Sequence, residues 1–328
     1  MIDWTDRHCR FFHRRFTRRA LLHTEMITAE AVIHGDRGRL LRFHADEHPL
    51  AIQLAGADPQ KIAAAAAIAA GVGYDEVNLN VGCPSDRVQS GKFGACLMRE
   101  PALVGDLVAA AKRAVAIPVT VKCRLGVDEQ DPDAALGAVA EAVVAAGADA
   151  IWVHARKAWL SGLSPKENRE IPPLDYGKVF ALKARFPETF VGINGGIGTL
   201  EQAEQLLEAV DGVMIGRAAY QNPQVLSEVD ARFYGDSDST VTAEDAVLAT
   251  LPYVAREIAN GTRLPAIARH MLGVFNGVPG ARRWRRIMTV DAIRPSAGPE
   301  TVLAALAAVT GSIPASSLAP SERALELA

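Results

Sequence analysis

The 328-residue sequence lacks several features that would point to other classes of protein. Its four cysteines are widely spaced and none forms a Cys-x-x-Cys pair, so neither a zinc ribbon nor another metal site is predicted. The charged N-terminus contains no apolar run, which argues against a secretory signal. No stretch reaches the about 20 apolar residues needed to cross a bilayer. These absences predict a soluble cytoplasmic protein with reduced thiols and no membrane partner.

The charge of the chain is small in sum but uneven in distribution. The formal net charge is −3, which taken alone argues weakly against a nucleic-acid partner. Residues 7–19 nevertheless interleave six arginines and two histidines with three phenylalanines, and residues 282–286 read Arg-Arg-Trp-Arg-Arg. The first stretch is compatible with a surface helix that has a solvated basic face, and equally with a face that contacts phosphates.

Short apolar strands alternate with helical segments through most of the chain. The predicted strands are Leu21–Met26, Leu50–Ala55, Glu76–Val81, Val119–Arg124, Ala150–Ala155, Val191–Asn194 and Gly212–Ile215. The helices predicted between them are Pro59–Ala70, Ala102–Val115, Asp133–Ala146, Tyr176–Phe186 and Leu200–Ala209. This alternation predicts a parallel sheet, and the number of repeats favours a (β/α)₈ TIM barrel. A doubly wound sheet is the alternative, but no Gly-x-Gly-x-x-Gly turn follows an early strand.

Only seven strands are predicted, whereas a closed barrel of this type needs eight. No strand precedes residues 1–5, so we expect that the first barrel strand is missing because the chain as given starts late, with a gap or frayed edge beside Leu21–Met26. A barrel that is open at its first position is the other explanation.

The pattern changes after Ala219, where the sequence predicts helices over 243–260, 262–276 and 299–310 without strands between them. We therefore expect a catalytic barrel over 1–234 and a helical domain over 240–311, joined by a polar hinge at 235–239. A flexible tail is predicted over 312–328, which is rich in Ser, Ala and Pro.

Polar or glycine residues stand at the C-terminal ends of six successive predicted strands, where the active site of such a barrel lies. They are Gln53, Asn80, Cys83, Lys122, Arg124, His154, Arg156, Asn194, Gly195, Gly196, Gly216 and Arg217. Each has an ordinary structural explanation: Cys83 as a buried filler, Lys122 in a salt bridge, His154 as a core histidine. Polar or glycine residues at the ends of six successive strands are hard to explain by packing. We therefore predict an active site at this end of the barrel, which we call the mouth.

The last two of these tips indicate the kind of ligand. Asn194-Gly195-Gly196 and Gly216-Arg217 each lead into a predicted helix. Glycines let backbone N–H groups approach a phosphate, and the last two strands of such barrels commonly form the phosphate site. Lys122 would lie in the same mouth, where a cation stabilises the negative charge of a reduced flavin.

Four motifs carry a resemblance to a known family. They are Asp3–Arg10, Asn78–Gln89 (Asn-Leu-Asn-Val-Gly-Cys-Pro-Ser-Asp-Arg-Val-Gln), Gly94–Met98, and His154–Leu160 continuing to Pro172–Tyr176. By these motifs the sequence resembles the tRNA-dihydrouridine synthases, specifically their A subfamily, from Met1 to about Val290. Members of the family usually extend N-terminally through a strand ending Ala-Pro-Met, which agrees with a late start.

What this resemblance implies is an FMN-dependent oxidoreductase that reduces uracil in the D-loop of tRNA, at the positions labelled 20 and 20a, with NADPH as the reductant of FMN. The hydride passes from flavin N5 to C6, and Cys83 matches the cysteine that protonates C5. A thiol suits this role because it is mostly protonated at neutral pH.

The resemblance also implies two sets of binding residues. Matching the FMN contacts are Met1, Ile2, Asp3, Gln53, Lys122, His154, Asn194, Gly195, Gly196, Gly216 and Arg217. Matching the tRNA contacts are Asn80, at the substrate nucleotide, and Lys166, Arg169, Arg282 and Arg285. No protein partner and no separate NADPH motif is evident.

Two rival functions remain open at this stage. One is an FMN barrel that reduces free pyrimidines, which would share the phosphate loops but have no use for the basic residues outside the mouth. The other is an RNA-binding chaperone that has kept the fold without redox activity. Intact Cys83 and Lys122 argue against the chaperone.

Overall fold

The computed structural model describes residues 1–85, 91–236 and 240–311. These residues form two compact units. The barrel unit comprises Met1–Arg10 and Arg19–Ala219, and the helical unit comprises Phe11–Arg18 and the described residues from Tyr220 onward. The domain limits expected from the sequence stay a prediction, because packing alone does not show which part folds independently. The expected tail, 312–328, and part of the expected hinge lie outside the described residues.

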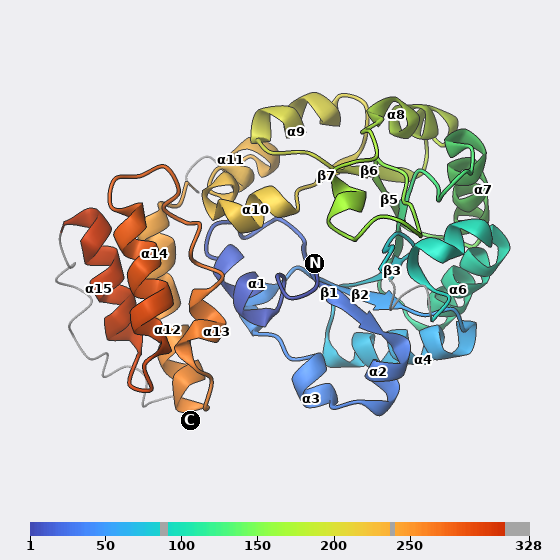
Figure 1. Ribbon diagram of the computed structural model, residues 1–328. Coiled ribbons are helices and arrows are strands. Elements are labelled where there is room, and N and C mark those ends of the chain that lie inside the picture. Colours follow the sequence, from blue (N-terminus) through green and yellow to red (C-terminus); the bar gives the residue numbers. More distant parts are fainter. Residues whose placement is uncertain (86–90, 237–239, 312–328) are drawn as a thin grey trace. The chain divides into compact units, whose positions relative to one another are not determined.

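The barrel unit is built on one parallel sheet whose strands follow chain order (Figure 1). The strands are β1 (Leu22–Thr28), β2 (Leu50–Ala55), β3 (Glu76–Asn80), β4 (Val119–Arg124), β5 (Ala150–His154), β6 (Phe190–Asn194) and β7 (Gly212–Met214). The sheet curls, and helices cover its outer side, as in a TIM barrel (Figure 1). Within the described residues β1 and β7 are the two edges, so the open position expected beside Leu21–Met26 is present.

The helices of the barrel unit alternate with its strands. They are α2 (Ala29–His34), α3 (Arg37–Leu40), α4 (Pro59–Val72), α6 (Pro101–Ala114), α7 (Pro132–Ala145), α8 (Tyr176–Arg185) and α9 (Leu200–Leu207), with short 3₁₀ turns η1 (Ala45–Glu47), η2 (Gly94–Arg99) and η3 (Glu167–Arg169). Side-chain caps start several of them: Asp58 accepts from Gln60 N and Lys61 N before α4, and Asp131 accepts from Ala134 N before α7. The seven strands and five barrel helices end within two residues of their predicted limits.

The helical unit consists of packed helices. It contains η4 (Pro223–Leu226), α11 (Val229–Tyr234), α12 (Ala243–Ala259), α13 (Leu264–Ala268), α14 (Ala281–Val290), η5 (Asp291–Ile293) and α15 (Pro299–Thr310), while α1 (Arg7–His13) and α10 (Arg217–Gln221) run from one unit into the other. Helix α15 packs against α12 and α14. Trp284 anchors α14: its ring is fully buried, packs against Phe275 and donates from Nε1 to Met271 O (3.1 Å).

The continuous helix predicted over 262–276 is wrong. The structure has only the short helix α13 there, followed by turns. Backbone N–H groups there bond to the carbonyl three residues earlier, as in Met271 N to Ala268 O (3.0 Å) and Val274 N to Met271 O (3.2 Å), so turns replace the helix. Within them Gly273 passes so close to Gln221 that a Cβ would lie 2.0 Å from its carbonyl oxygen, an approach that helical periodicity does not reveal.

Two arginines of the basic stretch 7–19 differ from both predicted interpretations, whereas Arg18 and Arg19 are exposed. Arg10 and Arg14 are 5% and 4% exposed, so neither lies on a solvated face or reaches an external phosphate. Arg10 Nε lies 2.7 Å from the buried carboxylate of Glu47, and its Nη1 donates to Thr5 O (2.9 Å). Arg14 Nη1 donates to Thr17 O (2.8 Å). These two arginines satisfy internal acceptors.

Candidate functional site

Cys83 is fixed just beyond the end of β3 by the side chain of Asn80. The Oδ1 atom of Asn80 accepts from Gly82 N (3.2 Å) and Cys83 N (3.0 Å), and Cys83 O accepts from Ala95 N (2.9 Å). The thiol is only half-buried, with Sγ 3.5 Å from Ser85 Oγ. The backbone at Cys83 is thus held on both sides while the sulfur stays accessible.

Gln53 and Asn80, predicted to contact flavin and substrate respectively, come together in the structure. Asn80 Nδ2 donates to Gln53 Oε1 (2.7 Å) across from β3 to β2. The backbone N–H of Gln53 donates to Thr24 Oγ1 (2.9 Å). The pair joins two neighbouring strand ends at the mouth.

Lys122 and Asn194 form a second pair between strand ends. Lys122 Nζ donates to Asn194 Oδ1 (3.1 Å), and Asn194 Nδ2 donates to Met214 O (2.7 Å). Burial lowers the pKa of Lys122 to about 8, and nearby Arg124 acts in the same direction. Lys122 is therefore mostly cationic at neutral pH, and no carboxylate pairs with it among the described residues.

His154, at the end of β5, is held neutral in the same region. Burial lowers its pKa well below the usual value, and the positive charges of Arg124, Lys122, Arg156 and Arg217 lower it further. Its Nδ1 atom is buried and has no hydrogen-bond partner in the part of the chain that the structure describes. An unsatisfied ring nitrogen of this kind is suited to contact a ligand.

The glycines after β6 allow a close approach to their backbone. Gly195 and Gly196 have φ angles of 121° and 71°, and a Cβ at Gly196 would lie 2.5 Å from Leu174 Cδ1. Tyr176 fixes this turn by donating from its hydroxyl to Gly195 O (2.6 Å). A side chain at Gly196 would be strained and crowded, so the turn requires glycine.

Arg217, which follows the second glycine-containing tip, contacts the long loop after β5. Its Nη1 pairs with Glu170 Oε1 (2.9 Å), and its Nη2 donates to Arg169 O (3.2 Å). The structure thus brings Arg169, predicted to contact tRNA, to a residue predicted to contact FMN.

Two arginines of the mouth had no role assigned from the sequence. Arg124 is buried and donates to Gly82 O (2.8 Å), Lys157 O (3.1 Å) and Asn168 O (2.9 Å), so it ties the Cys83 turn to the loop after β5. Arg156 donates to Pro172 O. Their positions at strand ends marked them, but only the fold shows which loops they join.

The mouth is strongly cationic and contains hydrogen-bond donors that have no partner among the described residues. Lys122, Arg124, Arg156 and Arg217 all act on His154, and Arg169 lies beside Arg217. The Nε atoms of Arg156 and Arg169 are buried and unpaired within the described ranges. Burial lowers the pKa of both groups, and Arg217 adds to this effect. Such a concentration of positive charge fits an anionic ligand.

The N-terminal residues lie partly at the mouth. A Cβ on Gly216 would be 3.7 Å from Met1 Sδ, which brings Met1 to one of the predicted tips. Ile2 is 51% exposed, and Asp3 N donates to Glu25 Oε1 of β1. The flavin contacts of Ile2 and Asp3 stay predictions.

The remaining basic residues predicted to contact tRNA divide between the two units. Lys166 is exposed and precedes η3 in the barrel unit. Arg282 and Arg285 are exposed on α14 of the helical unit, and Arg285 Nη1 donates to Asn276 Oδ1 (2.9 Å).

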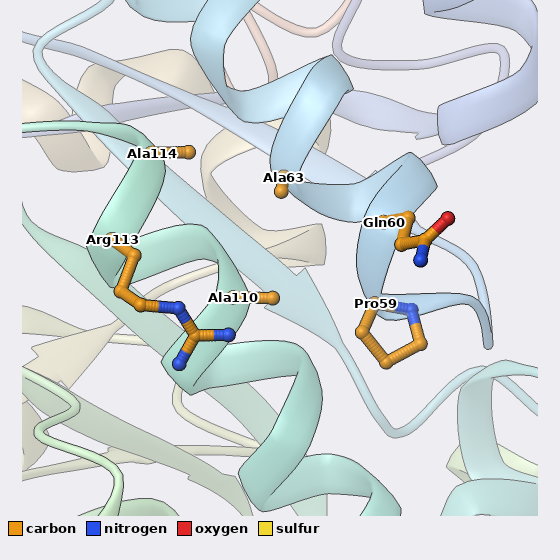
Figure 2. A pocket seen from close by; sticks show the side chains of 6 residues that line it. All are labelled: Pro59, Gln60, Ala63, Ala110, Arg113 and Ala114. Atoms are coloured by element: carbon orange, nitrogen blue, oxygen red, sulfur yellow. The ribbon is translucent and has the colours of Figure 1, made fainter.

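A surface hollow of about 280 Å³ lies between α4 and α6 (Figure 2). Its lining residues are Pro59, Gln60, Ala63, Ala110, Arg113 and Ala114. None of the strand-end residues lines it, and its one charged side chain is Arg113. We therefore place the candidate site at the barrel mouth and not in this hollow.

The described residues contain neither a membrane-spanning helix nor a cluster of metal ligands. No described helix is both long and apolar enough to cross a membrane. No group of three or more His, Cys, Asp or Glu side chains in residues 1–85, 91–236 and 240–311 is arranged to hold a metal ion.

The curled parallel sheet places this protein among the α/β-barrel proteins. A half-buried cysteine and several cationic side chains lie at the C-terminal mouth of this barrel. The sequence model for "Dihydrouridine synthase (Dus)" matches residues 1–308. The chain therefore belongs to the dihydrouridine synthase family.

Similar proteins are found in several bacteria. The chain is 53% identical over 310 residues to the "tRNA-dihydrouridine(20/20a) synthase" of Vibrio vulnificus, covering 94% of this chain and 95% of the relative. It is 54% identical over 302 residues to the protein of that name from Shewanella oneidensis, covering 92% and 90%. It is 53% identical over 298 residues to that of Escherichia coli K12, covering 90% and 86%.

Proposed function

We propose that this chain reduces uridines 20 and 20a in the D-loop of tRNA to 5,6-dihydrouridine. Family membership and the names of relatives at more than half identity support this substrate. The structural observation that carries the proposal is the fixed, accessible Cys83 at the mouth, next to Asn80. We also expect the protein to act in the cytoplasm, because its proposed substrate, tRNA, is found there.

The residues of the mouth fit FMN as the bound cofactor. The unpaired Nδ1 of His154, the crowded turn at Gly195 and Gly196, and the surplus arginine donors suit a ligand that combines polar ring atoms with a phosphate. The residues that would hold it are Gln53, Lys122, His154, Asn194, Gly195, Gly196, Gly216 and Arg217, with Met1, Ile2 and Asp3 at the edge. At this site FMN, once reduced by NADPH, would supply the hydride for uracil C6.

Cys83 is the residue of this chain that donates the proton to uracil C5. Its thiol is accessible, and its backbone is fixed by Asn80 Oδ1 and by Ala95 N. Asn80 would also meet the substrate nucleotide, since it lies at the same strand end. A uridine stacked in a folded tRNA must turn out of its stack to reach this depth, which costs a few kcal/mol.

Contacts to the tRNA backbone would offset that cost. Lys166 and Arg169 in the barrel unit, and Arg282 and Arg285 in the helical unit, are the residues we propose for this role. Lys166, Arg282 and Arg285 are exposed. Such contacts give affinity through phosphates and shape, so a protein of net charge −3 can still bind RNA.

The test is to incubate purified protein with an unmodified tRNA transcript, FMN and NADPH, and to map reduced uridines by mass spectrometry of D-loop fragments. We expect a yellow protein and two extra hydrogens on uridine 20 and uridine 20a. Turnover of free uridine or uracil with no change in tRNA would contradict the proposal and favour reduction of free pyrimidines. Colourless protein that binds tRNA without reducing it would favour the chaperone alternative.

A further inference from the structure

A row of buried polar side chains crosses the barrel beneath the mouth. Strand register sets Gln53 opposite Asn78, and Asn78 opposite Thr120. Asn78 and Thr120 are 0% and 2% exposed. Buried polar residues in the middle of a barrel replace apolar packing, so their hydrogen bonds need an explanation.

These side chains form one continuous chain of hydrogen bonds that ends at the cysteine. Thr120 Oγ1 donates to Glu76 Oε1 (2.5 Å), and Asn78 Nδ2 donates to Thr120 Oγ1 (2.8 Å). Gln53 Nε2 donates to Asn78 Oδ1 (2.8 Å), and Asn80 Nδ2 donates to Gln53 Oε1 (2.7 Å). Asn80 Oδ1 then accepts from the backbone of Gly82 and Cys83.

From this arrangement we propose that Glu76, Asn78 and Thr120 are positioning residues, which fix the side-chain orientation of Asn80 and thereby the place of Cys83. The inference rests on the proposed function of Cys83. None of the three residues is at a predicted strand tip, and none was assigned a role from the sequence.

The two ends of the chain determine its direction. A carboxylate can only accept hydrogen bonds, whereas the backbone N–H groups of Gly82 and Cys83 can only donate them. Each of the three carboxamides between them could by itself be turned either way. With both ends fixed, only one orientation of each amide satisfies every donor and acceptor.

The hydroxyl of Thr120 is the link on which this direction depends. Within this row of hydrogen-bonded side chains, it is the group that both accepts from the amide of Asn78 and donates to the carboxylate of Glu76. Without it, Asn78 Nδ2 lacks an acceptor, and only the backbone N–H groups of Gly82 and Cys83 still favour this orientation of the amides. The free energy that separates the two orientations of Asn80 is then smaller, and an Asn80 that turns presents its NH₂ group to two backbone N–H groups and releases the Cys83 turn. Bonds in such a network support one another, so the loss reaches beyond one contact.

Two substitutions at Thr120 test this inference. Thr120→Val keeps the shape but removes the hydroxyl, while Thr120→Ser keeps the hydroxyl. Thr250→Val is the matched control, because Thr250 is also buried and donates its hydroxyl, to Ala246 O within α12. Should Thr120→Val fail to fold, the half-buried Glu76 provides a second pair: Glu76→Leu removes the acceptor and Glu76→Gln retains one.

The measurements are kcat and KM for tRNA, FMN affinity, and the rate at which iodoacetamide alkylates Cys83 in flavin-free protein. For Thr120→Val we expect kcat to fall about 10- to 100-fold, since small misplacements at a reacting group have effects of this size. We expect KM and FMN affinity to change less than kcat, although Gln53 and Asn80 belong to the proposed binding sites, and alkylation to be roughly threefold faster or more because the turn opens more often. Thr120→Ser and Thr250→Val should stay within about twofold of wild type in each.

The inference would be overturned by Thr120→Val with wild-type kcat and alkylation, or by a loss that Thr120→Ser shares. A loss confined to KM or to FMN affinity would also contradict it. Wild-type protein is assayed first: if it forms no dihydrouridine, the proposed function fails. If it does and Thr120→Val matches it, only the positioning role fails.

Discussion

Lys122 carries its charge in a half-buried place without a carboxylate partner among the residues described. Burial lowers its pKa to about 8, so folding holds a cation that is only partly hydrated. An anionic ligand would restore favourable interactions for that cation. The charge is present below pH 8 and is lost as the pH rises above it.

Flavin affinity should therefore depend on pH through Lys122. In flavin-free wild-type protein we expect the Kd for FMN to be about tenfold higher at pH 9 than at pH 7, with a break near pH 8. Lys122→Met should bind FMN more weakly at pH 7 and show no such break. Lys112→Met, which removes an exterior lysine paired with Asp149, is the control and should behave as wild type. A wild-type Kd that is constant over this range would contradict a role for the charge of Lys122.

For individual residues, the sequence predicted well which side chains lie at the mouth. It did not predict which groups these side chains contact there. Strand tips could be found because alternation and apolar composition mark the strands. The partners of Arg124 and Arg156 could not, because a long side chain reaches a loop whose path the sequence does not reveal. The hydrogen bonds that orient Asn80 depend on register between three strands, which no local pattern specifies.

The turn after β6 is the element that most directly shapes the proposed phosphate site. Gly196 has a φ angle of 71°, and a Cβ there would crowd Leu174 Cδ1 and the hydroxyl of Tyr176. The glycine pair was predicted as a phosphate turn, but the crowding at Gly196, which adds to its positive φ angle, comes from Leu174 in a loop distant in sequence.

Gly196→Ala should weaken FMN binding by about tenfold or more and lower the stability of the protein by roughly 1–3 kcal/mol, since it forces a side chain into a strained backbone conformation. Isothermal titration with FMN and urea unfolding measure the two effects. Gly198→Ala is the matched control in the same turn, because its Cβ would find nothing nearer than Gln202 Oε1 at 3.7 Å. Equal effects of the two substitutions would show that the turn tolerates a side chain at Gly196.

Elements with strong periodicity were predicted well, and those shaped by close packing were not. The barrel strands and helices follow their patterns. Helix α14 was not predicted as a helix, since its run of arginines reads first as charge. In the structure Trp284 and Met288 are buried one turn apart, and the arginines occupy the exposed positions.

On the scale of the whole molecule, the charge that matters for RNA is local. The chain has 35 basic and 38 acidic residues, yet the barrel mouth and α14 both concentrate arginine. Some basic residues contribute nothing to such a surface: Arg10 and Arg14, from the stretch 7–19, are buried. Sequence counting cannot separate these cases, because burial depends on contacts between distant segments.

Arg282→Ala combined with Arg285→Ala should weaken tRNA binding and reduce the slope of log K against log salt by about 2, since each lost phosphate contact reduces it by about 1. Binding is measured by filter retention at several salt concentrations. A control with the same change in charge is Arg39→Ala with Arg113→Ala, two exposed arginines on α3 and α6. An unchanged slope in the α14 variant would remove these two arginines from the tRNA-binding surface.

The central claim is that Cys83 supplies the proton when this barrel reduces uridine. The direct measurement is a single turnover, in which protein with prereduced flavin is mixed with unmodified tRNA and reoxidation is followed by absorbance. We expect Cys83→Ala to bind flavin and tRNA normally but to react about 100-fold or more slowly, as for removal of a general acid. Cys96→Ala, at another half-buried free cysteine, should react as wild type. A Cys83→Ala variant that reacts at the wild-type rate would contradict the claim.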